Sequence, residues 1–287
     1  MKIDEDFLVL RHDAMRLTLD PRRGGAIRDF NWRGQDIFRP TPADAGDDPF
    51  DTACFPMVPY VNRVANGRFN FDGRAVQLER NWRQDPHPLH GNGWRSSWSV
   101  VDASASKATV RFEGGAEEWL GSYRCEQCFD LVDGGLFVEL SVQNLSDAPM
   151  PAMLGLHPYF GDAARAQMRA QVPRVWLTDR AALPVRETQT PVDWGFDPAR
   201  AVDSVPLDNC FSGWNGTAAL CWPERTVTLQ ATHCKHLHVY VPPREDFFCV
   251  EPQTSANGAL GREAGEATVI APGERFAIEV QFSVGAA

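Results

Sequence analysis

The sequence of 287 residues lacks any long apolar run. No stretch approaches the roughly 20 consecutive apolar residues that a membrane-spanning helix requires. The first ten residues, MKIDEDFLVL, include three acidic residues where a secretion signal has positive charge ahead of a longer apolar region. We therefore expect neither a transmembrane segment nor a signal peptide.

Positive charge is scarce as well. The chain has 28 lysines and arginines against 38 aspartates and glutamates, which gives a formal net charge of -10. The acidic residues are scattered and form no run. Binding of nucleic acid without sequence preference requires a basic surface, and so does attraction to an anionic membrane. We therefore expect neither nucleic acid nor a membrane among the partners.

Cysteines are too few and too widely spaced for the dense disulfide framework of a small secreted domain. There are seven, an odd number, which favours a reducing cytoplasmic location. Cys125 and Cys128 form a C-x-x-C motif, but no second pair follows it. An offset of three residues places these two side chains on opposite faces of a strand, so we expect no metal there.

The sequence also lacks sustained helical periodicity. Its 21 prolines and 23 glycines separate short segments in which apolar and polar residues alternate, as in half-buried strands. Residues 123–131 and 136–142 alternate in this way on either side of the turn sequence Asp133-Gly134-Gly135. Together they predict an antiparallel hairpin.

The same pattern recurs elsewhere in the chain. Residues 68–78 contain the turn pair Asp72-Gly73 between two alternating segments, and residues 276–282 alternate as a final strand with one polar face. Residues 166–172, AQMRAQV, have a composition that favours a helix, yet their apolar residues alternate. We predict a strand there too.

These segments predict one all-β domain that spans residues 1–287. Apolar residues make up 43% of the chain and charged residues 23%, a balance that allows a large buried core. No linker, repeat or low-complexity segment divides it. Residues 40–49 are rich in Pro, Asp and Gly, but strand patterns continue on both sides, which indicates a surface loop. We expect a large antiparallel β-sandwich.

Polar and ionisable residues collect beside proline or glycine in four places. They are residues 59–67 (PYVNRVANG), 86–93 (PHPLHGNG), 155–160 (GLHPYF) and 250–257 (VEPQTSAN). Such segments suit loops or bulges at strand ends, where a sheet can direct a side chain into a cleft.

His157 and Glu251 are the candidate acid and base. An isolated histidine is usually a hydrogen-bonded core residue, but His157 lies in an apolar segment and is fixed by the following Pro158. Glu251 follows the apolar residues 247–250, so we expect its carboxylate in a partly buried site where burial and neighbours change its pKa. A structural ion pair between Glu251 and Arg63 or another arginine is the alternative.

A histidine-rich segment near residue 235 has two interpretations. His233, His236 and His238 surround Cys234, and on a strand Cys234, His236 and His238 share one face. Zinc binding is one interpretation. We favour a solvated strand face, because no set of spaced ligands supports a metal site.

Three tryptophans lie close to the candidate motifs. Trp82, Trp94 and Trp98 suit either a platform on which a sugar stacks or the hydrophobic core. The sequence leaves both interpretations open.

Taken together, these segments resemble the aldose 1-epimerase, or galactose mutarotase, family, in the same order along most of the chain. The motifs that carry the resemblance are NRVANG (62–67) followed by Arg68 and Phe69, LHG (89–91), HPYF (157–160), LDNCF (207–211) and VEPQ (250–253). The resemblance implies a large antiparallel β-sandwich of the galactose mutarotase-like supersandwich type. It also implies a cleft for a monosaccharide, no metal and no cofactor.

The implied reaction interconverts the α and β anomers of a free aldose such as galactose or glucose. By matched motif, His157 resembles the residue that protonates the ring oxygen, and Glu251 the base on the anomeric hydroxyl. Arg63, His90 and Asp208 resemble residues that hold sugar hydroxyls. Asn62 is expected beside them.

Elementary chemistry agrees with these roles. Ring opening needs a proton at one oxygen while another proton leaves the adjacent hydroxyl, so an acid and a base must act together. Ordinary pKa values are about 6.5 for histidine and about 4.3 for glutamate. A carboxylate such as Glu251 or Asp208 nearby favours the imidazolium form, so we expect His157 to be the proton donor.

A related substrate class consists of hexose 6-phosphates. Arg63, Arg68 and Arg95 lie in or near the matched motifs and suit a phosphate dianion, so a hexose-6-phosphate mutarotase is an alternative.

Two further alternatives use the same residues differently. Asp208 and Glu251 could form the carboxylate pair of a glycoside hydrolase, but His157 then has no role. A non-catalytic carbohydrate-binding protein on the same scaffold needs no proton transfer. The presence of both His157 and Glu251 argues against it.

Overall fold

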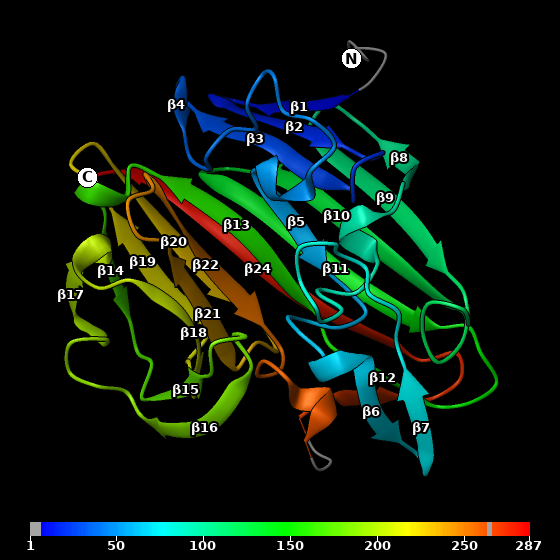
Figure 1. The fold of residues 1–287 in the computed structure, drawn as a ribbon. Helices are drawn as coiled ribbons and strands as arrows, with labels where there is room; N and C mark the ends of the chain where they lie inside the picture. Colours follow the sequence, from blue (N-terminus) through cyan, green and yellow to red (C-terminus); the bar gives the residue numbers. More distant parts are fainter. Residues whose placement is uncertain (1–6, 263–265) are drawn as a thin grey trace.

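The computed structural model of the protein describes residues 7–262 and 266–287, so most of the acidic N-terminal segment lies outside the described residues. In the described part, regular structure consists of strands and short 3-10 turns, and strands account for 53% of residues. No helix there has the length and apolarity to cross a membrane. Two large antiparallel sheets lie one behind the other (Figure 1). The predicted all-β sandwich is confirmed.

The first large sheet carries the candidate site, and its described part has eleven strands. In spatial order these are β1 (Leu8–His12), β2 (Met15–Asp20), β3 (Ala26–Trp32), β5 (Cys54–Met57), β13 (Gly155–Gly161), β22 (Phe247–Gln253), β21 (His236–Val241), β18 (Leu207–Ser212), β15 (Arg174–Thr178) and β16 (Pro184–Gln189), with β4 (Gln35–Asp36) paired to β3.

The second large sheet has nine strands among the described residues. In spatial order these are β17 (Phe196–Ala201), β14 (Gln167–Ala170), β19 (Thr217–Cys221), β20 (Arg225–Ala231), β24 (Arg275–Ala286), β11 (Gly135–Asn144), β10 (Tyr123–Val132), β9 (Lys107–Gly114) and β8 (Ser99–Ala103).

The remaining elements are small. Two strand pairs lie apart from the large sheets, β6 (Arg68–Phe71) with β7 (Arg74–Gln77) and β12 (Met150–Ala152) with β23 (Thr268–Ile270). The 3-10 turns are η1 (Pro49–Asp51), η2 (Ala65–Gly67), η3 (Gly93–Arg95), η4 (Ala163–Arg165), η5 (Val202–Ser204) and η6 (Ala259–Gly261).

The predicted hairpins are confirmed. β10 and β11 pair antiparallel around the Asp133-Gly134 turn, and β6 and β7 pair around Asp72-Gly73. Within β10 every second side chain is buried, which puts Cys125 inside and leaves the Cys128 side chain half-buried on the other face. The predicted strands near residues 166–172 and 276–282 are β14 and β24, and residues 40–49 form an irregular, mostly exposed loop.

The core lies between the two large sheets and is rich in aromatic rings. Phe160 of β13 stacks on Phe248 of β22 in the first sheet, with ring centroids 5.5 Å apart. Phe38 packs edge-on against Phe160 at 5.4 Å and against Phe282 of β24 at 4.9 Å, which connects the two sheets. Each buried phenylalanine stabilises the fold by about 1.5–3 kcal/mol. Because side chains alternate along a strand, the neighbours of Phe160 point away from this core.

Candidate active site

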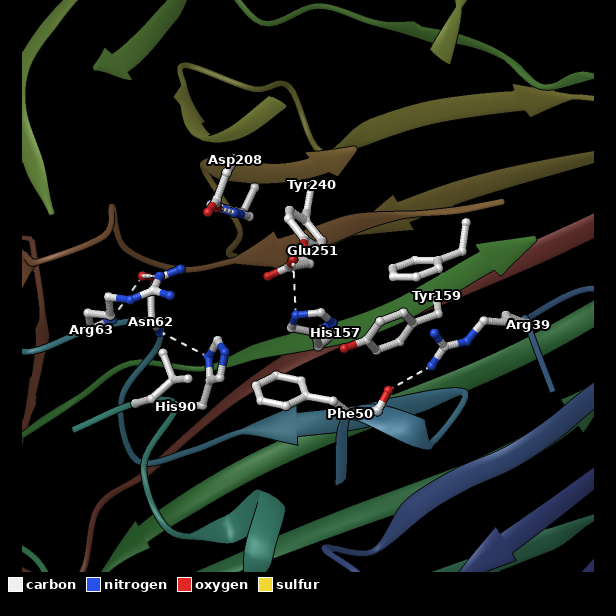
Figure 2. Close-up of a pocket in the computed structure, with 13 residues that line it drawn as sticks. Arg39, Phe50, Asn62, Arg63, His90, His157, Tyr159, Asp208, Tyr240 and Glu251 are labelled. Carbon is white, nitrogen blue, oxygen red and sulfur yellow. Dashed lines mark hydrogen bonds and ion pairs between the residues drawn. The ribbon is translucent and has the colours of Figure 1, made fainter. Parts of the chain in front are cut away.

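A pocket of about 280 Å³ opens over the first sheet. All six site residues predicted from the sequence line it (Figure 2). Its lining side chains are Arg39, Phe50, Asn62, Arg63, Leu89, His90, His157, Tyr159, Asp208, His238, Tyr240, Phe247 and Glu251.

Strand register brings the acid and base candidates together. Between β13 and β22 the pairs Gly155–Gln253 and Tyr159–Cys249 lie on either side of His157 and Glu251. Because each strand advances four residues between these pairs, the midpoints His157 and Glu251 stand directly opposite each other on one face. β21 continues the row on the far side of β22.

His157 and Glu251 are in contact. His157 Nε2 lies 3.3 Å from Glu251 Oε1, and the two side chains are 8% and 1% exposed. Figure 2 shows them pointing toward each other. The other polar atoms, Nδ1 of His157 and Oε2 of Glu251, are buried without a hydrogen-bond partner in the described residues. Buried polar atoms are normally paired, so these two are available to a ligand.

Two aromatic rings pack against the His157 ring. It stacks on Phe55 at 4.4 Å and on Tyr159 at 4.8 Å between ring centroids. The Arg39 guanidinium lies over the other face of Tyr159, 4.1 Å from the ring centroid. The Arg39 guanidinium is held in place by hydrogen bonds that it donates to the Phe50 and Thr52 carbonyl oxygens. The imidazole is therefore packed among aromatic rings and has little rotational freedom.

Burial determines where the proton of this pair resides. It lowers the pKa of His157 to about 3 and raises the pKa of Glu251 to about 7. The expectation that a neighbouring carboxylate makes His157 an imidazolium is therefore wrong for the unliganded protein, because desolvation outweighs that attraction. Between these two values the pair holds one proton, which resides on Glu251.

Two loops that bond each other position Asn62 and His90. Both have left-handed backbones, with φ of 52° and 56°. The Asn62 N–H donates to His90 Nδ1 at 3.2 Å, and the His90 N–H donates to the Asn62 carbonyl oxygen at 3.0 Å. Burial holds the pKa of His90 well below its ordinary value. Because Nδ1 accepts a hydrogen bond, the neutral ring carries its proton on Nε2 and can donate it to a ligand.

Gly91 and Trp94 support the loop that carries His90. Gly91 has φ of +72°, and a Cβ at this position would lie 2.0 Å from the Val58 carbonyl oxygen, so only glycine fits. The indole N–H of Trp94 donates to the carbonyl oxygens of Leu89 and Gly91.

The tryptophans are structural. Trp94 and Trp98 are core residues, 0% and 3% exposed. Trp82 packs behind the pocket residue Phe50, with ring centroids 5.3 Å apart. None of the three lines the pocket, so they do not form a platform for a sugar in it.

Arg63 is fixed by an acid other than Glu251. Its Nε donates to Asp85 Oδ2 at 2.7 Å, and its backbone N–H donates to Asn62 Oδ1 at 2.9 Å. The ion pair of Arg63 is with Asp85, and Glu251 contacts His157, so the alternative of a structural Glu251–Arg63 pair is not observed among the described residues.

His238 is a pocket residue that the sequence analysis misinterpreted. It lies on β21 opposite Glu251 and is 3% exposed, so the favoured solvated strand face is wrong for it. Cys234 precedes the strand, and His236 is half-buried. The signal was available: His238 and Tyr240 alternate with apolar Leu237 and Val239, as His157 does with its own neighbours.

Asp208 and His238 form a second ionisable pair in the pocket. His238 Nε2 lies 3.0 Å from Asp208 Oδ1. Burial acts to raise the pKa of Asp208, but the hydrogen bond with His238 keeps it below its ordinary value. Burial acts to lower the pKa of His238, and the attraction of Glu251 with the bond to Asp208 raises it instead.

One group near the pocket has the donor types of a metal site. Donor atoms of His157, Cys249 and Glu251 lie within 4.8 Å of one another. Burial raises the pKa of the Cys249 thiol well above its usual range, whereas a metal requires the thiolate. The sidechains around Cys234 form no such group in the described residues. The absence of a metal stays a prediction.

Comparison with known proteins shows the family. Residues 6–283 match the sequence family described as aldose 1-epimerase. The chain is 32% identical over 288 residues to the uncharacterized protein YphB of Escherichia coli K12, covering 96% of this chain and 97% of the relative. It is 26% identical over 182 residues to the uncharacterized protein YihR of the same organism, covering 60% and 56%.

Solved structures agree. A candidate aldose 1-epimerase from Escherichia coli K12 superposes with a TM-score of 0.92 at 30% identity, covering 98% of this chain and 99% of the other. A galactose mutarotase-like protein from Clostridium acetobutylicum shares the fold, with a TM-score of 0.86 at 18% identity over 99% and 100% of the chains. The chain belongs to the aldose 1-epimerase family.

Proposed function

We propose that this protein is a sugar isomerase that interconverts the α and β anomers of a free aldose such as galactose or glucose, without a cofactor. The observation that carries the proposal is the contact between His157 Nε2 and Glu251 Oε1 in the pocket. The ring oxygen and the anomeric hydroxyl are bonded to the same carbon, so their acid and base must be close neighbours. His157 and Glu251 meet this requirement.

The proposed reaction begins with proton transfer at both oxygens. His157 Nε2 donates a proton to the ring oxygen while the unpaired Oε2 of Glu251 accepts the proton of the anomeric hydroxyl. The bond between C1 and the ring oxygen breaks, which leaves an open-chain aldehyde. After rotation about C1–C2, the ring hydroxyl attacks the other face of the aldehyde, and both protons return. The pair ends with the proton it began with.

The resting location of the proton fits this cycle. In the unliganded protein it resides on Glu251, because burial raises the pKa of Glu251 to about 7 and lowers that of His157 to about 3. The 3.3 Å contact provides the path by which it reaches His157 when a sugar binds. A pair that shares one proton is neutral overall, which suits a buried site better than a lone charge does.

The remaining polar residues are proposed to hold the sugar hydroxyls. His90 presents a neutral N–H donor, Arg63 a guanidinium held by Asp85, and Asp208 an ionised acceptor. Asn62 helps to fix two of them: its Oδ1 accepts from the Arg63 backbone N–H, and its own backbone N–H donates to His90 Nδ1. This mixture of donors and acceptors suits a neutral polyol.

A hexose 6-phosphate is a second candidate substrate, and one observation favours it. Arg39 lines the pocket and has no carboxylate partner in the described residues. Two of the arginines that suggested this substrate from the sequence do not line the pocket: Arg68 bonds Gln77, and Arg95 lies over Trp82. Because carbonyl oxygens already bind the Arg39 guanidinium, we favour the neutral sugar.

Optical rotation tests the proposal. Freshly dissolved α-D-galactose or α-D-glucose should reach its equilibrium rotation faster with the protein than without it, with the same final value and with EDTA present. Parallel runs with glucose 6-phosphate and a nitrophenyl galactoside separate the phosphomutarotase and the hydrolase. If no sugar equilibrates faster, a non-catalytic carbohydrate-binding protein replaces the proposal.

A further inference from the structure

His238 faces the pocket at one ring nitrogen and a chain of buried amides at the other. Its Nε2 contacts Asp208 Oδ1 at 3.0 Å, and its Nδ1 contacts Asn257 Nδ2 at 3.1 Å. Asn257 and His238 are 1% and 3% exposed, so both contacts are shielded from water. Which nitrogen carries a proton depends on the direction of the hydrogen bonds in this chain.

The direction is set at the far end, where a backbone carbonyl can only accept. Gln253 Nε2 lies 2.8 Å from the Ser255 carbonyl oxygen, so the nitrogen of this amide must face it. The same Nε2 lies 2.9 Å from Asn257 Oδ1 and 3.3 Å from Cys210 Sγ, and it donates its second hydrogen to the oxygen, because sulfur is the weaker acceptor. Asn257 therefore turns its NH2 group toward His238, and His238 Nδ1 must accept.

An accepting Nδ1 leaves a neutral ring with its proton on Nε2, where it donates to Asp208. We propose that the Ser255–Gln253–Asn257 chain fixes His238 as this neutral tautomer and makes it a positioning residue that holds Asp208 as an ionised acceptor for a sugar hydroxyl. The role at the hydroxyl rests on the proposed mutarotase function. The tautomer does not.

The alternative is an imidazolium, which the neighbouring charges partly favour. Glu251 on β22 and Asp208 on β18 attract a proton to the ring, whereas Arg63 and, when protonated, His157 and His90 repel it. The strongest attraction comes from Glu251, which carries its own proton below about pH 7 and then exerts little pull.

A second proton on His238 also has a cost within the chain. An Nδ1–H would face the NH2 group of Asn257, and rotating that amide would turn its NH2 group toward Gln253 Nε2. Either arrangement leaves two buried donors facing each other without an acceptor, which is strongly disfavoured. At neutral pH the amide chain therefore determines the tautomer.

The decisive measurement is the ¹⁵N spectrum of the imidazole of His238 in the wild-type protein, assigned by comparison with His238→Gln. In the wild type we expect Nδ1 of His238 to be unprotonated and Nε2 to be protonated at every pH value between 6 and 8. In Asn257→Asp the NH2 group becomes an acceptor while the bond from Gln253 is kept, and we expect both nitrogens to carry protons. A doubly protonated ring in the wild type, or an unchanged ring in Asn257→Asp, overturns the tautomer assignment.

Kinetics test the positioning role. Glutamine can reproduce both bonds of the neutral ring, donating to Asp208 and accepting from Asn257, so His238→Gln should keep kcat/KM within about threefold. His238→Leu removes both bonds and should raise KM about tenfold or more with a smaller change in kcat. An equal loss in the two variants overturns the role, and thermal melting of both checks that they are folded. If the wild type has no mutarotase activity, the proposed function fails, but the ¹⁵N measurement still tests the tautomer of His238.

Discussion

At the scale of single residues, the site depends on a buried pair that shares one proton. His157 and Glu251 touch at 3.3 Å, and each has a second polar atom without a partner in the described residues. A pair of this kind can give a proton and take one in the same encounter. Conservative changes that keep shape and remove titration should therefore separate its chemistry from its packing.

His157→Asn and Glu251→Gln should each lower kcat/KM for mutarotation by about 100-fold or more, the usual contribution of a general acid or base. Both should remain folded, because the shapes of the side chains are nearly kept. Polarimetry with the uncatalysed rate subtracted measures the loss, and circular dichroism checks the fold. Glu187→Gln, which breaks an outer ion pair with Arg174, is the control. A fully active Glu251→Gln protein would refute the assigned base.

The same two variants should change how stability depends on pH. Unfolded glutamate and histidine titrate near 4.5 and 6.5, whereas in the fold Glu251 titrates at about 7 and His157 at about 3. Between pH 4.5 and 6.5 the pair holds one proton in both states, so in the wild type it adds no slope. With His157→Asn only the folded state holds a proton in this range, so stability should fall as pH rises. With Glu251→Gln only the unfolded state holds one, so stability should rise.

Urea unfolding at pH 4.5, 5.5 and 6.5 measures these slopes. One proton corresponds to about 1.4 kcal/mol per pH unit, with opposite sign in the two variants relative to the wild type. Other ionisable groups are common to all three proteins and cancel in the comparison. Parallel curves for the three proteins would show that the pair does not have the proton affinities assigned to it.

At the scale of elements, strand register builds the site. His157, Glu251 and His238 come from the adjacent strands β13, β22 and β21, and they lie in one row across the sheet. A shift of one residue in any of these strands would send its side chain into the core. The apolar neighbours of each residue therefore secure its direction.

The loop that carries His90 should be as sensitive as the strands. Gly91 and Gly73 have the same φ of +72°, but a Cβ at 91 would lie 2.0 Å from the Val58 carbonyl oxygen, whereas nothing lies within 4 Å at 73. Gly73→Ala should cost about 1–2 kcal/mol for its backbone conformation alone. Gly91→Ala should cost at least about 2 kcal/mol more and should raise KM, because the backbone must move away.

Chemical denaturation and steady-state kinetics on the two alanine variants give the comparison. The matched backbone angle means that any difference in unfolding free energy comes from the contact with Val58. Equal losses of stability in both proteins would contradict a close-packed loop.

Much of this level of structure could be predicted from the sequence. Alternation and turn pairs indicated the hairpins at Asp72-Gly73 and Asp133-Gly134, and the motif resemblance indicated His157 and Glu251. His238 was misinterpreted because the other histidines near it suggested a solvated face, although its alternation with Leu237 and Val239 indicated otherwise. Its position opposite Glu251 depends on the register between β21 and β22, which the alternation alone does not give.

The protonation state of His157 is a second property that the sequence alone did not predict. The sequence indicates a nearby carboxylate, which favours an imidazolium, but the opposing effect of burial depends on the packing of Phe55 and Tyr159 against the ring. Those contacts exist only in the folded protein. Arg39 was not singled out either, because nothing in residues 36–40 distinguishes it from a surface arginine.

At the scale of the whole molecule, we predict that the chain unfolds as one unit. The two large sheets share one core, with Phe38 in contact with Phe160 of one and Phe282 of the other. Heating monitored by tryptophan fluorescence and by far-ultraviolet circular dichroism should therefore give one coincident transition. Two separate midpoints would indicate independent domains and contradict the single domain over residues 1–287.

The row of site residues also makes catalysis a reporter of assembly. β21 and β22 are consecutive in the chain, whereas β13 lies far before them, and each of the three strands supplies one member of the row. The pairing of β13 with β22 therefore joins distant segments, and such pairings form slowly. During refolding, the return of sugar turnover should therefore lag behind the return of the circular dichroism signal of β-strands. Its return marks the time at which the last of these strands has paired.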